Sequence, residues 1–446
     1  MKIVIAGAGE VGTYLAKMLN RSDHDIILID EVKEKLLEIA SYFDLLTVHG
    51  SATSLKTLQE ANVGDADLFI AVAREQAVNI ISSILAKKLG AKKTIARIDN
   101  NEYIDPEHRK IITELGADSL VYPEILASDE IVNIINHPGV LKSIEFASGR
   151  LSLFTLKLTS ASPLVDKTLI DVAKLFPDVK ARVVAVSRGS KTIIPRGHDV
   201  LREGDTIYIV ADSSNMDKIN DMLNLKDFDI KNVMILGGSR IGVKTAKALE
   251  KNRYVKLFEK DREKSLLLAE ELSNTLVINA EARSAEFLMD EGISRVDAFI
   301  AVTGNSEINI LSSLLAKRLG VKITIAEVEN TDYIDLAKNM EIDFIINKKL
   351  IAASHIFAFT VNAEVASVQC FTETDAEVVE FIVSKNAKIT RKPLKDIDFP
   401  EGAIVGGVDR GGEVFIAVGD THIQAGDRVV VFALPNVIDK VAKFFK

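Results

Sequence analysis

Three glycines near the start of the chain have a spacing that suits phosphate binding. Gly7, Gly9 and Gly12 follow a short apolar run at residues 3–6. At this spacing the first glycine makes a tight turn, the second lets the backbone approach a pyrophosphate, and the third lets a helix pack on the strand. The N–H groups at the start of that helix attract phosphates. The turn therefore supplies the first candidate ligand-binding residues: Gly7, Ala8, Gly9, Glu10, Val11 and Gly12.

An acidic residue follows at the distance expected for a ribose contact. Residues 25–30 are predicted to form a second strand that ends in Asp30, whose carboxylate would accept both ribose hydroxyls. Glu31 and Val32 come next, and neither is an arginine that would accept a 2′-phosphate. The pattern therefore favours NAD(H) over its phosphorylated form. ATP and ADP carry the same ribose, so they remain alternatives for this half-site.

The elements that must position these residues alternate between strand and helix as far as residue 136. Further strands are predicted over residues 45–49, 67–73, 93–98 and 119–122, with helices over 32–42 and 55–60 and another that stops at Gly90. Such an alternation predicts a parallel, doubly wound sheet with its ligand crevice at the carboxyl ends of the strands.

The pattern changes from about residue 141 to short strands separated by turn residues. Strands are predicted over residues 151–158, 182–188, 193–194 and 206–210, which indicates a small α+β domain. This segment carries no acid–base cluster, so we expect it to sense a ligand or contact another subunit.

The chain then repeats itself. Gly237 lies 230 residues after Gly7, and Asn309 stands in the same relation to Asn79. A tandem duplication explains this register. The predicted fold class is α/β, with two doubly wound parallel-sheet Rossmann-like domains, each followed by a small α+β domain. The predicted boundaries are residues 1–138, 139–225, 226–362 and 363–446.

The two halves differ where a ligand would be bound. Ser239 replaces the middle glycine, so a side chain intrudes where the backbone must approach a pyrophosphate. Glu259 ends the second strand and keeps an acid there, whereas Arg97 becomes Glu327, which would repel a diphosphate if it faces the crevice. We expect the second site to bind differently, more weakly or not at all. Its candidate residues are Gly237, Ser239, Arg240 and Glu259.

Composition excludes several classes of protein. A formal net charge of −9 over 446 residues argues against a nucleic-acid binder, which needs a basic face. No apolar run approaches the roughly 18 residues that span a bilayer, and no signal-peptide pattern opens the chain, so we expect a soluble, cytoplasmic protein. The single cysteine, Cys370, excludes an internal disulfide framework and a cysteine-clustered metal site.

The residues also carry a family resemblance. The chain resembles the tandem RCK (regulator of potassium conductance, or KTN) proteins of Trk-type potassium uptake systems. It departs from their usual pattern at Ser51, where an acid is common, and at residues 74–78, where a Thr-rich acidic stretch is usual. The matching residues are Gly7 to Gly12, Asp30, Ala71 to Ala73, Asn79, Ala96 to Ile98, Tyr103, Ser162 to Leu164, Ile194 to Gly197, and Gly204-Asp205.

The resemblance implies regulation rather than turnover. It implies a homo-oligomer (a ring, dimer or tetramer) on the inner face of the cell membrane, where it gates a membrane potassium-translocating subunit according to the bound nucleotide. Gly50, Ser51 and Ala73 join the candidate ligand-binding residues. Arg97 would neutralise phosphates or form an exterior salt bridge, and Asn79 would contact the ligand or cap its helix region.

Two alternatives remain open. The first is an NAD-dependent oxidoreductase whose small domain binds the substrate; the histidines are scattered, and His49, at a strand end, is the one worth testing as a catalyst. The second concerns the apolar helix predicted over residues 123–136. We expect it to cross to a neighbouring unit rather than to be buried within its own domain.

Overall fold

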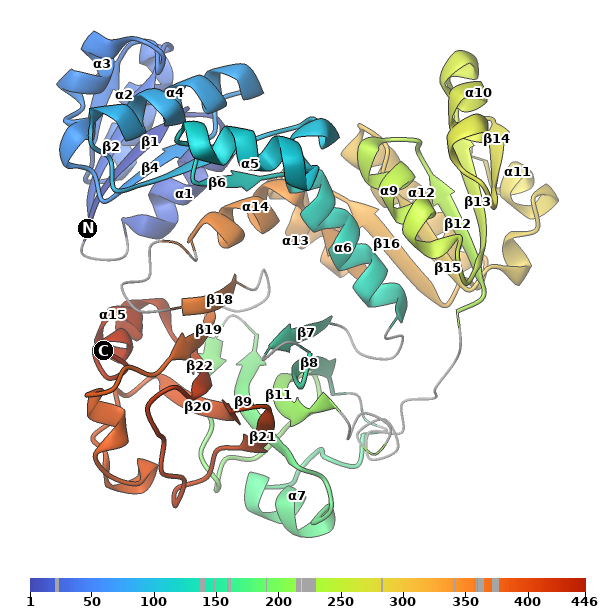
Figure 1. Ribbon diagram of the computed structural model, residues 1–446. Helices are drawn as coiled ribbons and strands as arrows, with labels where there is room; N and C mark the ends of the chain where they lie inside the picture. The colour runs from blue at the N-terminus through green and yellow to red at the C-terminus, as the bar shows by residue number, and fades with distance from the viewer. Residues whose placement is uncertain are drawn as a thin grey trace.

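The computed structural model describes residues 1–20, 24–136, 142–146, 149–158, 160, 162–189, 191–213, 218, 230–281, 284–340, 342–357, 359, 365–370 and 377–446. Figure 1 shows two α/β units in the upper half of the molecule and two small β-rich domains below them. One described sheet falls within each of the four predicted segments. The boundaries between those segments stay predictions.

The first unit is a six-stranded parallel sheet in the order β3-β2-β1-β4-β5-β6. Its central strands are apolar on both faces because helices cover both sides, as the alternating pattern predicts. Its strands are β1 (Lys2–Ala6), β2 (Asp25–Asp30), β3 (Leu46–His49), β4 (Leu68–Ala71), β5 (Lys93–Arg97) and β6 (Ser119–Val121). Its helices are α1 (Glu10–Leu19), α2 (Lys33–Tyr42), α3 (Leu55–Glu60), α4 (Gln76–Leu89), α5 (Pro106–Leu115) and α6 (Pro123–Asn136).

The second unit repeats this topology in the order β14-β13-β12-β15-β16-β17, again parallel. The predicted duplication of the doubly wound fold is confirmed. Its strands are β12 (Asn232–Leu236), β13 (Tyr254–Glu259), β14 (Thr275–Asn279), β15 (Ala298–Ala301), β16 (Ile323–Glu327) and β17 (Phe344–Ile346). Its helices are α9 (Arg240–Leu249), α10 (Arg262–Glu271), α11 (Ala285–Asp290), α12 (Ser306–Arg318), α13 (Asp332–Asn339) and α14 (Lys348–Phe357).

Each small domain holds a five-stranded antiparallel sheet. The two sheets share a core, in which the rings of Tyr208 and Phe432 lie 5.5 Å apart. The first domain contains β7 (Lys142–Phe146), β8 (Leu151–Lys157), β9 (Ala181–Arg188), β10 (Lys191–Ile193), β11 (Thr206–Asp212) and helix α7 (Leu169–Leu175). The second contains β18 (Val365–Cys370), β19 (Glu377–Ile382), β20 (Ala403–Arg410), β21 (Glu413–Ile416), β22 (Arg428–Ala433) and helix α15 (Ile438–Ala442).

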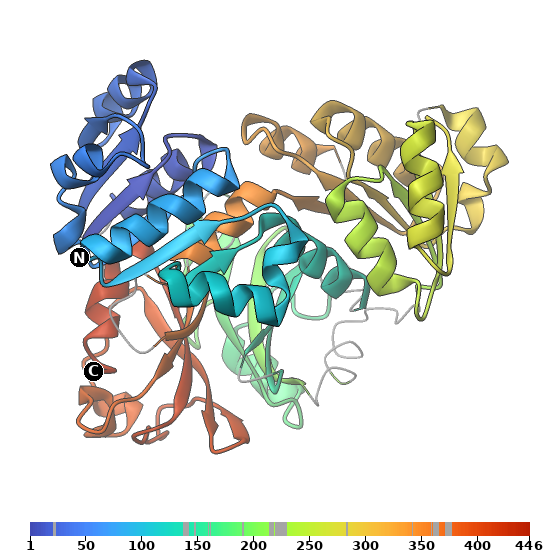
Figure 2. The ribbon, with the colours of Figure 1, turned by 45° about the horizontal axis from the view of Figure 1, so that its top comes forward.

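The last helix of each Rossmann unit packs on the other unit. Helix α6 lies against α9, and its Ile131 and Ile135 join the apolar core of the second unit. Helix α14 lies against α1, and its Ala353 and Ile356 join the core of the first unit. Figures 1 and 2 both show this exchange. The prediction that residues 123–136 cross to a neighbouring unit is confirmed, and that unit is the other half of the same chain.

Candidate functional site

The glycine turn between β1 and α1 is built as its spacing predicts. Gly7 has a φ of +111°, and a Cβ there would lie 2.7 Å from the backbone nitrogen of Ala73. A Cβ on Gly12 would collide with the carbonyl oxygen of Gly7. Gly9 differs, since a Cβ there would meet nothing within 4 Å. Gly7 and Gly12 are therefore required by packing, whereas Gly9 leaves open space at the helix start.

Helix α1 begins without a side-chain cap. Its N-cap residue is Gly9, which offers no hydroxyl or carboxylate to the N–H groups of the first turn. The first N–H groups of a helix have no partner within the helix, and together with the helix dipole they form an anion-binding site. The start of α1 is therefore prepared to accept a phosphate.

Asp30 holds the turn in place from the end of β2. Its Oδ2 accepts the Ala8 N–H at 2.6 Å, and its Oδ1 accepts the Val32 N–H at 2.8 Å. A carboxylate oxygen can accept a second hydrogen bond. Asp30 can therefore support the turn and still accept ribose hydroxyls.

These residues face one pocket of about 520 Å³. The predicted residues in its walls are Gly7, Gly9, Glu10, Val11, Asp30, Gly50, Ala73 and Arg97. The wall does not include Ala8, Gly12, Ser51 or Asn79. The hydroxyl of Ser51 lies 3.1 Å from that of Thr53, within its own turn.

Asn79 lies behind the pocket. It is buried, and its Nδ2 donates to the carbonyl oxygens of Ala73 at 3.0 Å and Arg97 at 2.9 Å. It therefore ties the ends of β4 and β5 together, a role that differs from both ligand contact and helix capping. Among the described residues its Oδ1 has no hydrogen-bond partner.

The structure adds a group that the sequence reasoning missed. Lys348 and Lys349, the first two residues of α14, line the pocket of the first unit. The sequence does carry a signal for this pair, because the helix dipole disfavours two cations in the first turn of a helix unless anions lie close by. Sequence reasoning could not place them there, since they reach this pocket only through the exchange of α14.

Three carboxylates hold the two lysines. The Nζ atom of Lys348 is 3.1 Å from Glu327, that of Lys349 is 3.1 Å from Glu329, and Lys349 also pairs with Glu10. Burial raises the pKa of Glu327, and Lys348 only partly opposes it. Burial also acts to raise the pKa of Glu329, but the two lysines outweigh it and lower that pKa. The lysines thus lie between carboxylates of the second unit and a pocket of the first.

The second glycine turn has a similar backbone but a filled helix start. Gly237 has a φ of +109°. The Oγ of Ser239 accepts the Gly242 N–H at 3.2 Å and caps α9. The Oε2 of Glu259 accepts the Gly238 N–H at 3.2 Å and lies 3.0 Å from the Nζ of Lys264. The helix start that has no side-chain cap in the first turn is thus capped here by the protein itself.

Two further expectations can be compared with the structure. Glu327 was expected to repel a diphosphate if it faced the crevice, but it is 2% exposed and pairs with Lys348, so that condition is not met. The other expectation concerned His49 as a catalyst. Its Nε2 lies 3.0 Å from the carbonyl oxygen of Glu31, and it is not part of the pocket wall.

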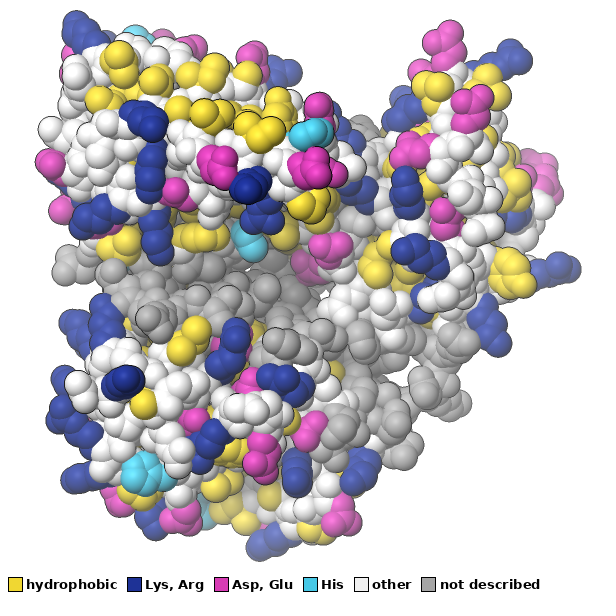
Figure 3. All heavy atoms as spheres, in the orientation of Figure 1, with side chains coloured by type: hydrophobic (Ala, Val, Ile, Leu, Met, Phe, Trp, Pro, Cys, Tyr) yellow, Lys and Arg dark blue, Asp and Glu magenta, His cyan; other side chains and the backbone are white. Residues whose placement is uncertain are grey.

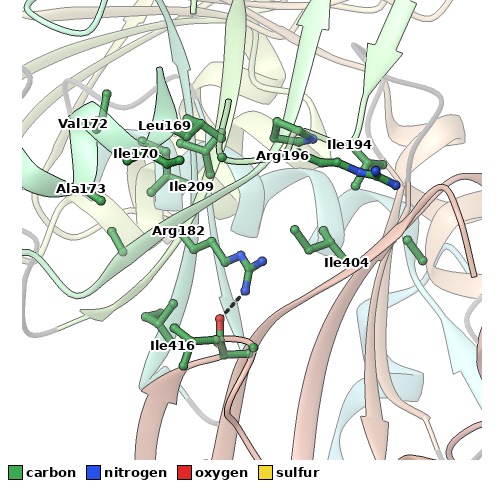
Figure 4. A pocket seen from close by; sticks show the side chains of 18 of the residues that line it. Leu169, Ile170, Val172, Ala173, Arg182, Ile194, Arg196, Ile209, Ile404 and Ile416 are labelled. Carbon is green, nitrogen blue, oxygen red and sulfur yellow. Dashed lines mark hydrogen bonds between the residues drawn. The ribbon is translucent and has the colours of Figure 1, made fainter. Parts of the chain in front are cut away.

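A larger cavity of about 770 Å³ lies between the two small domains. Figure 4 shows aliphatic side chains and Arg182, whose guanidinium donates to the Ala417 carbonyl. Burial lowers the pKa of Arg182. Because its walls are mainly aliphatic, this cavity suits a nucleotide less than the glycine turn does, although it is larger.

The fold and the two glycine turns define a tandem of Rossmann-type units, each joined to a small antiparallel domain. Family models agree with this division: the TrkA-N domain matches residues 3–123 and 233–348, and the TrkA-C domain matches residues 153–224 and 378–446. The chain belongs to the TrkA family, which confirms the resemblance found in the sequence.

Curated relatives are similar over nearly their full length. The Trk system potassium uptake protein TrkA of Halomonas elongata is 34% identical over 444 residues, which cover 99% of this chain and 96% of that protein. A TrkA homolog of Archaeoglobus fulgidus is 34% identical over 449 residues and covers 100% of both. The names of these relatives are those of potassium uptake proteins rather than of enzymes.

Solved structures share the fold. The GsuK channel bound to NAD matches with a TM-score of 0.61 at 17% identity, covering 99% of this chain and 78% of that one. The GsuK RCK domain matches with a TM-score of 0.60, also at 17% identity, and the match covers 99% of this chain and 94% of that one. At this identity the likeness shows the fold alone.

Proposed function

We propose that this protein is the nucleotide-binding regulatory subunit of a potassium uptake system. It gates a membrane potassium-translocating partner in response to NAD(H) or an adenine nucleotide. The observation that carries the proposal is the uncapped start of α1, which opens with Asp30 into one 520 Å³ pocket. The potassium uptake proteins among its relatives supply the physiological setting.

The residues of the first pocket fit a dinucleotide or an adenine nucleotide. The N–H groups of Glu10, Val11 and Gly12 would hold a pyrophosphate at the helix start. The Asp30 carboxylate would accept the ribose hydroxyls. Arg97 lines the same pocket and would neutralise phosphate charge. NAD(H) is the ligand that we favour, with ATP and ADP as alternatives because they share the same ribose and phosphates.

The proposal assigns regulation rather than turnover. An oxidoreductase needs an acid or base beside the nicotinamide. The histidine considered for that role, His49, contacts a backbone carbonyl outside the pocket wall. The potassium uptake names of the relatives also favour regulation over the oxidoreductase alternative.

The proposed location is the cytoplasmic face of the cell membrane, where the protein is bound to the translocating partner. Among the described residues, no helix is both long and apolar enough to cross a bilayer. We propose a homo-oligomer, a ring, dimer or tetramer, without nucleic acid. Ile81, Ile111 and Leu115 are exposed on α4 and α5, where Figure 3 shows apolar side chains gathered, and such patches favour association.

Titration calorimetry of the full chain with NADH, NAD, ADP and ATP tests the binding step. We expect one site per chain for the preferred ligand. Potassium flux through vesicles that contain the translocating partner should then change when this protein and the nucleotide are added together.

Two results would refute the proposal. One is the absence of binding by all four nucleotides. The other is sustained oxidation of NADH with a small carbonyl compound, which would establish the oxidoreductase instead.

A further inference from the structure

Two cations of the second unit end in the nucleotide pocket of the first. The side chains of Lys348 and Lys349 are each 21% exposed, so both ammonium groups are largely shielded from water. A shielded charge interacts more strongly with a nearby ion than an exposed one does. A phosphate at the start of α1 would therefore meet two strong partners from α14.

Both lysines already have carboxylate partners. Lys348 contacts Glu327 and Glu329, while Lys349 contacts Glu329 and Glu10. Glu10 is the first residue of α1, so Lys349 pairs at the very end of the helix where a phosphate would bind. An arriving phosphate would compete with these carboxylates for the same ammonium groups.

The equivalent place beside the second turn has the opposite charge. Glu124 is the second residue of α6, as Lys349 is of α14. It lies 4.0 Å from Arg240, the first residue of α9, as Glu10 is the first residue of α1. Both units therefore have an ion pair between the exchanged helix and the helix that follows the glycine turn, but the positions of the positive and negative charge are reversed. The exchange of helices brings cations to the first turn and an anion to the second.

We propose that Lys348 and Lys349 determine the phosphate specificity of the first site, so that the second unit sets how strongly this site prefers a longer phosphate chain. Bound phosphates draw the lysines away from Glu327 and Glu329, and occupancy of the first unit is thereby transmitted to the end of β16. This inference rests on the proposed function, because it assumes that the first pocket binds a nucleotide.

The test compares ADP, AMP and adenosine on the full-length protein by calorimetry at fixed salt. In the Lys348→Gln/Lys349→Gln variant, ADP should bind about 100-fold more weakly, or roughly tenfold per lost charge-assisted contact. Adenosine affinity should stay within about twofold, because it carries no phosphate for the lysines to contact. The preference for ADP over adenosine should therefore collapse.

Matched variants separate this reading from a general loss of charge or fold. Lys56→Gln/Lys110→Gln removes two charges from exposed positions of the first unit, 87% and 75% exposed, and should leave the preference intact. Lys348→Arg/Lys349→Arg keeps the charges and should keep the preference. Glu329→Gln frees the lysines of a competitor and should tighten ADP binding about threefold.

The outcomes distinguish the two proposals. If the unmutated protein binds none of the three ligands and no NADH, the proposed function fails. If it binds ADP and the double glutamine variant keeps the same preference for ADP over adenosine, the role of the lysines is refuted while the proposed function stands. Weaker ADP binding by Glu329→Gln would likewise refute the competition between phosphate and carboxylate.

Discussion

The two glycine turns share one backbone plan but treat the helix start in opposite ways. In the first, Gly9 leaves the N–H groups of α1 without a side-chain cap, and its position faces open space. In the second, Ser239 caps α9 through the Gly242 N–H. A helix start can either bind an anion or be satisfied by its own chain. The comparison teaches that one side chain at the N-cap decides whether a helix start is satisfied by its own chain.

The acids at the strand ends differ less than the helix starts do. Asp30 accepts the N–H groups of Ala8 and Val32, and Glu259 accepts the equivalent N–H groups of Gly238 and Asp261. Glu259 also lies 3.0 Å from the Nζ of Lys264. A Cβ at Gly238 would lie 2.8 Å from Glu259 Oε2, so a side chain there would require this carboxylate to shift. Both acids thus support their own turn, and the second one is also paired with a lysine.

The largest difference between the two turns is expected when each of the two acids is removed separately. Asp30→Ala should weaken nucleotide binding about 10- to 100-fold, because it removes charge-assisted bonds to the ribose. Glu259→Ala should leave the affinity of the first site unchanged. Calorimetry on the full chain measures both. Equal affinity in Asp30→Ala and the unmutated protein would show that the ribose lies elsewhere.

A smaller effect is expected from giving the first turn the cap of the second. Gly9→Ser places a hydroxyl where it can accept the Gly12 N–H, as Ser239 accepts that of Gly242. We expect NADH to bind about tenfold more weakly, through loss of one helix N–H to the cap. Thermal unfolding should show no destabilisation, since open space surrounds this position. Undiminished binding by a folded Gly9→Ser protein would contradict the role given to capping.

Removal of the cap from the second turn should have a smaller effect on nucleotide binding. Ser239→Gly loses a cap at a cost of a few tenths of a kcal/mol and frees the Gly242 N–H. We expect a second, weaker NADH site to appear in the calorimetric stoichiometry. Ser239→Ala serves as the control, because it also removes the cap but keeps a Cβ at the turn. Two equivalent NADH sites in the unmutated protein would show that the second turn was never closed.

The smallest expected effect concerns pH. Burial acts to raise the pKa of Glu259, but the Asp261 N–H, Lys264 and the Gly238 N–H outweigh it and hold the pKa below its usual value. A lowered folded-state pKa gives stability that is present above the unfolded pKa and lost as the pH falls through the folded one. The gap in melting temperature between the unmutated protein and Glu259→Gln should therefore be constant above about pH 5 and shrink below about pH 4.5. A gap that widens on acidification would contradict this sign.

The residues at the centre of the candidate site were predictable from the sequence, whereas the role of those at its edge was not. Gly7, Gly9 and Asp30 were predictable because a strand, a turn and the next strand fix their mutual positions within one βαβ unit. Asn79 was harder, because its amide bonds two strand ends that are adjacent only in the sheet. That the pocket residues bind a nucleotide stays a prediction.

The sequence by itself determined the duplication, the parallel strands of the two Rossmann sheets, the two turns and the difference at Ser239. These features depend on local spacing and on apolar patterns that each segment carries alone. Tertiary structure alone decided that Lys348 and Lys349 reach the first pocket, and that Glu327 is buried beside Lys348 rather than open to the second crevice. The physical reason for the position of the lysines is the exchange of α14, since a helix that packs on the other unit brings Lys349 to Glu10, 339 positions away in the chain. Glu327 is buried because the end of β16 lies beside the start of α14.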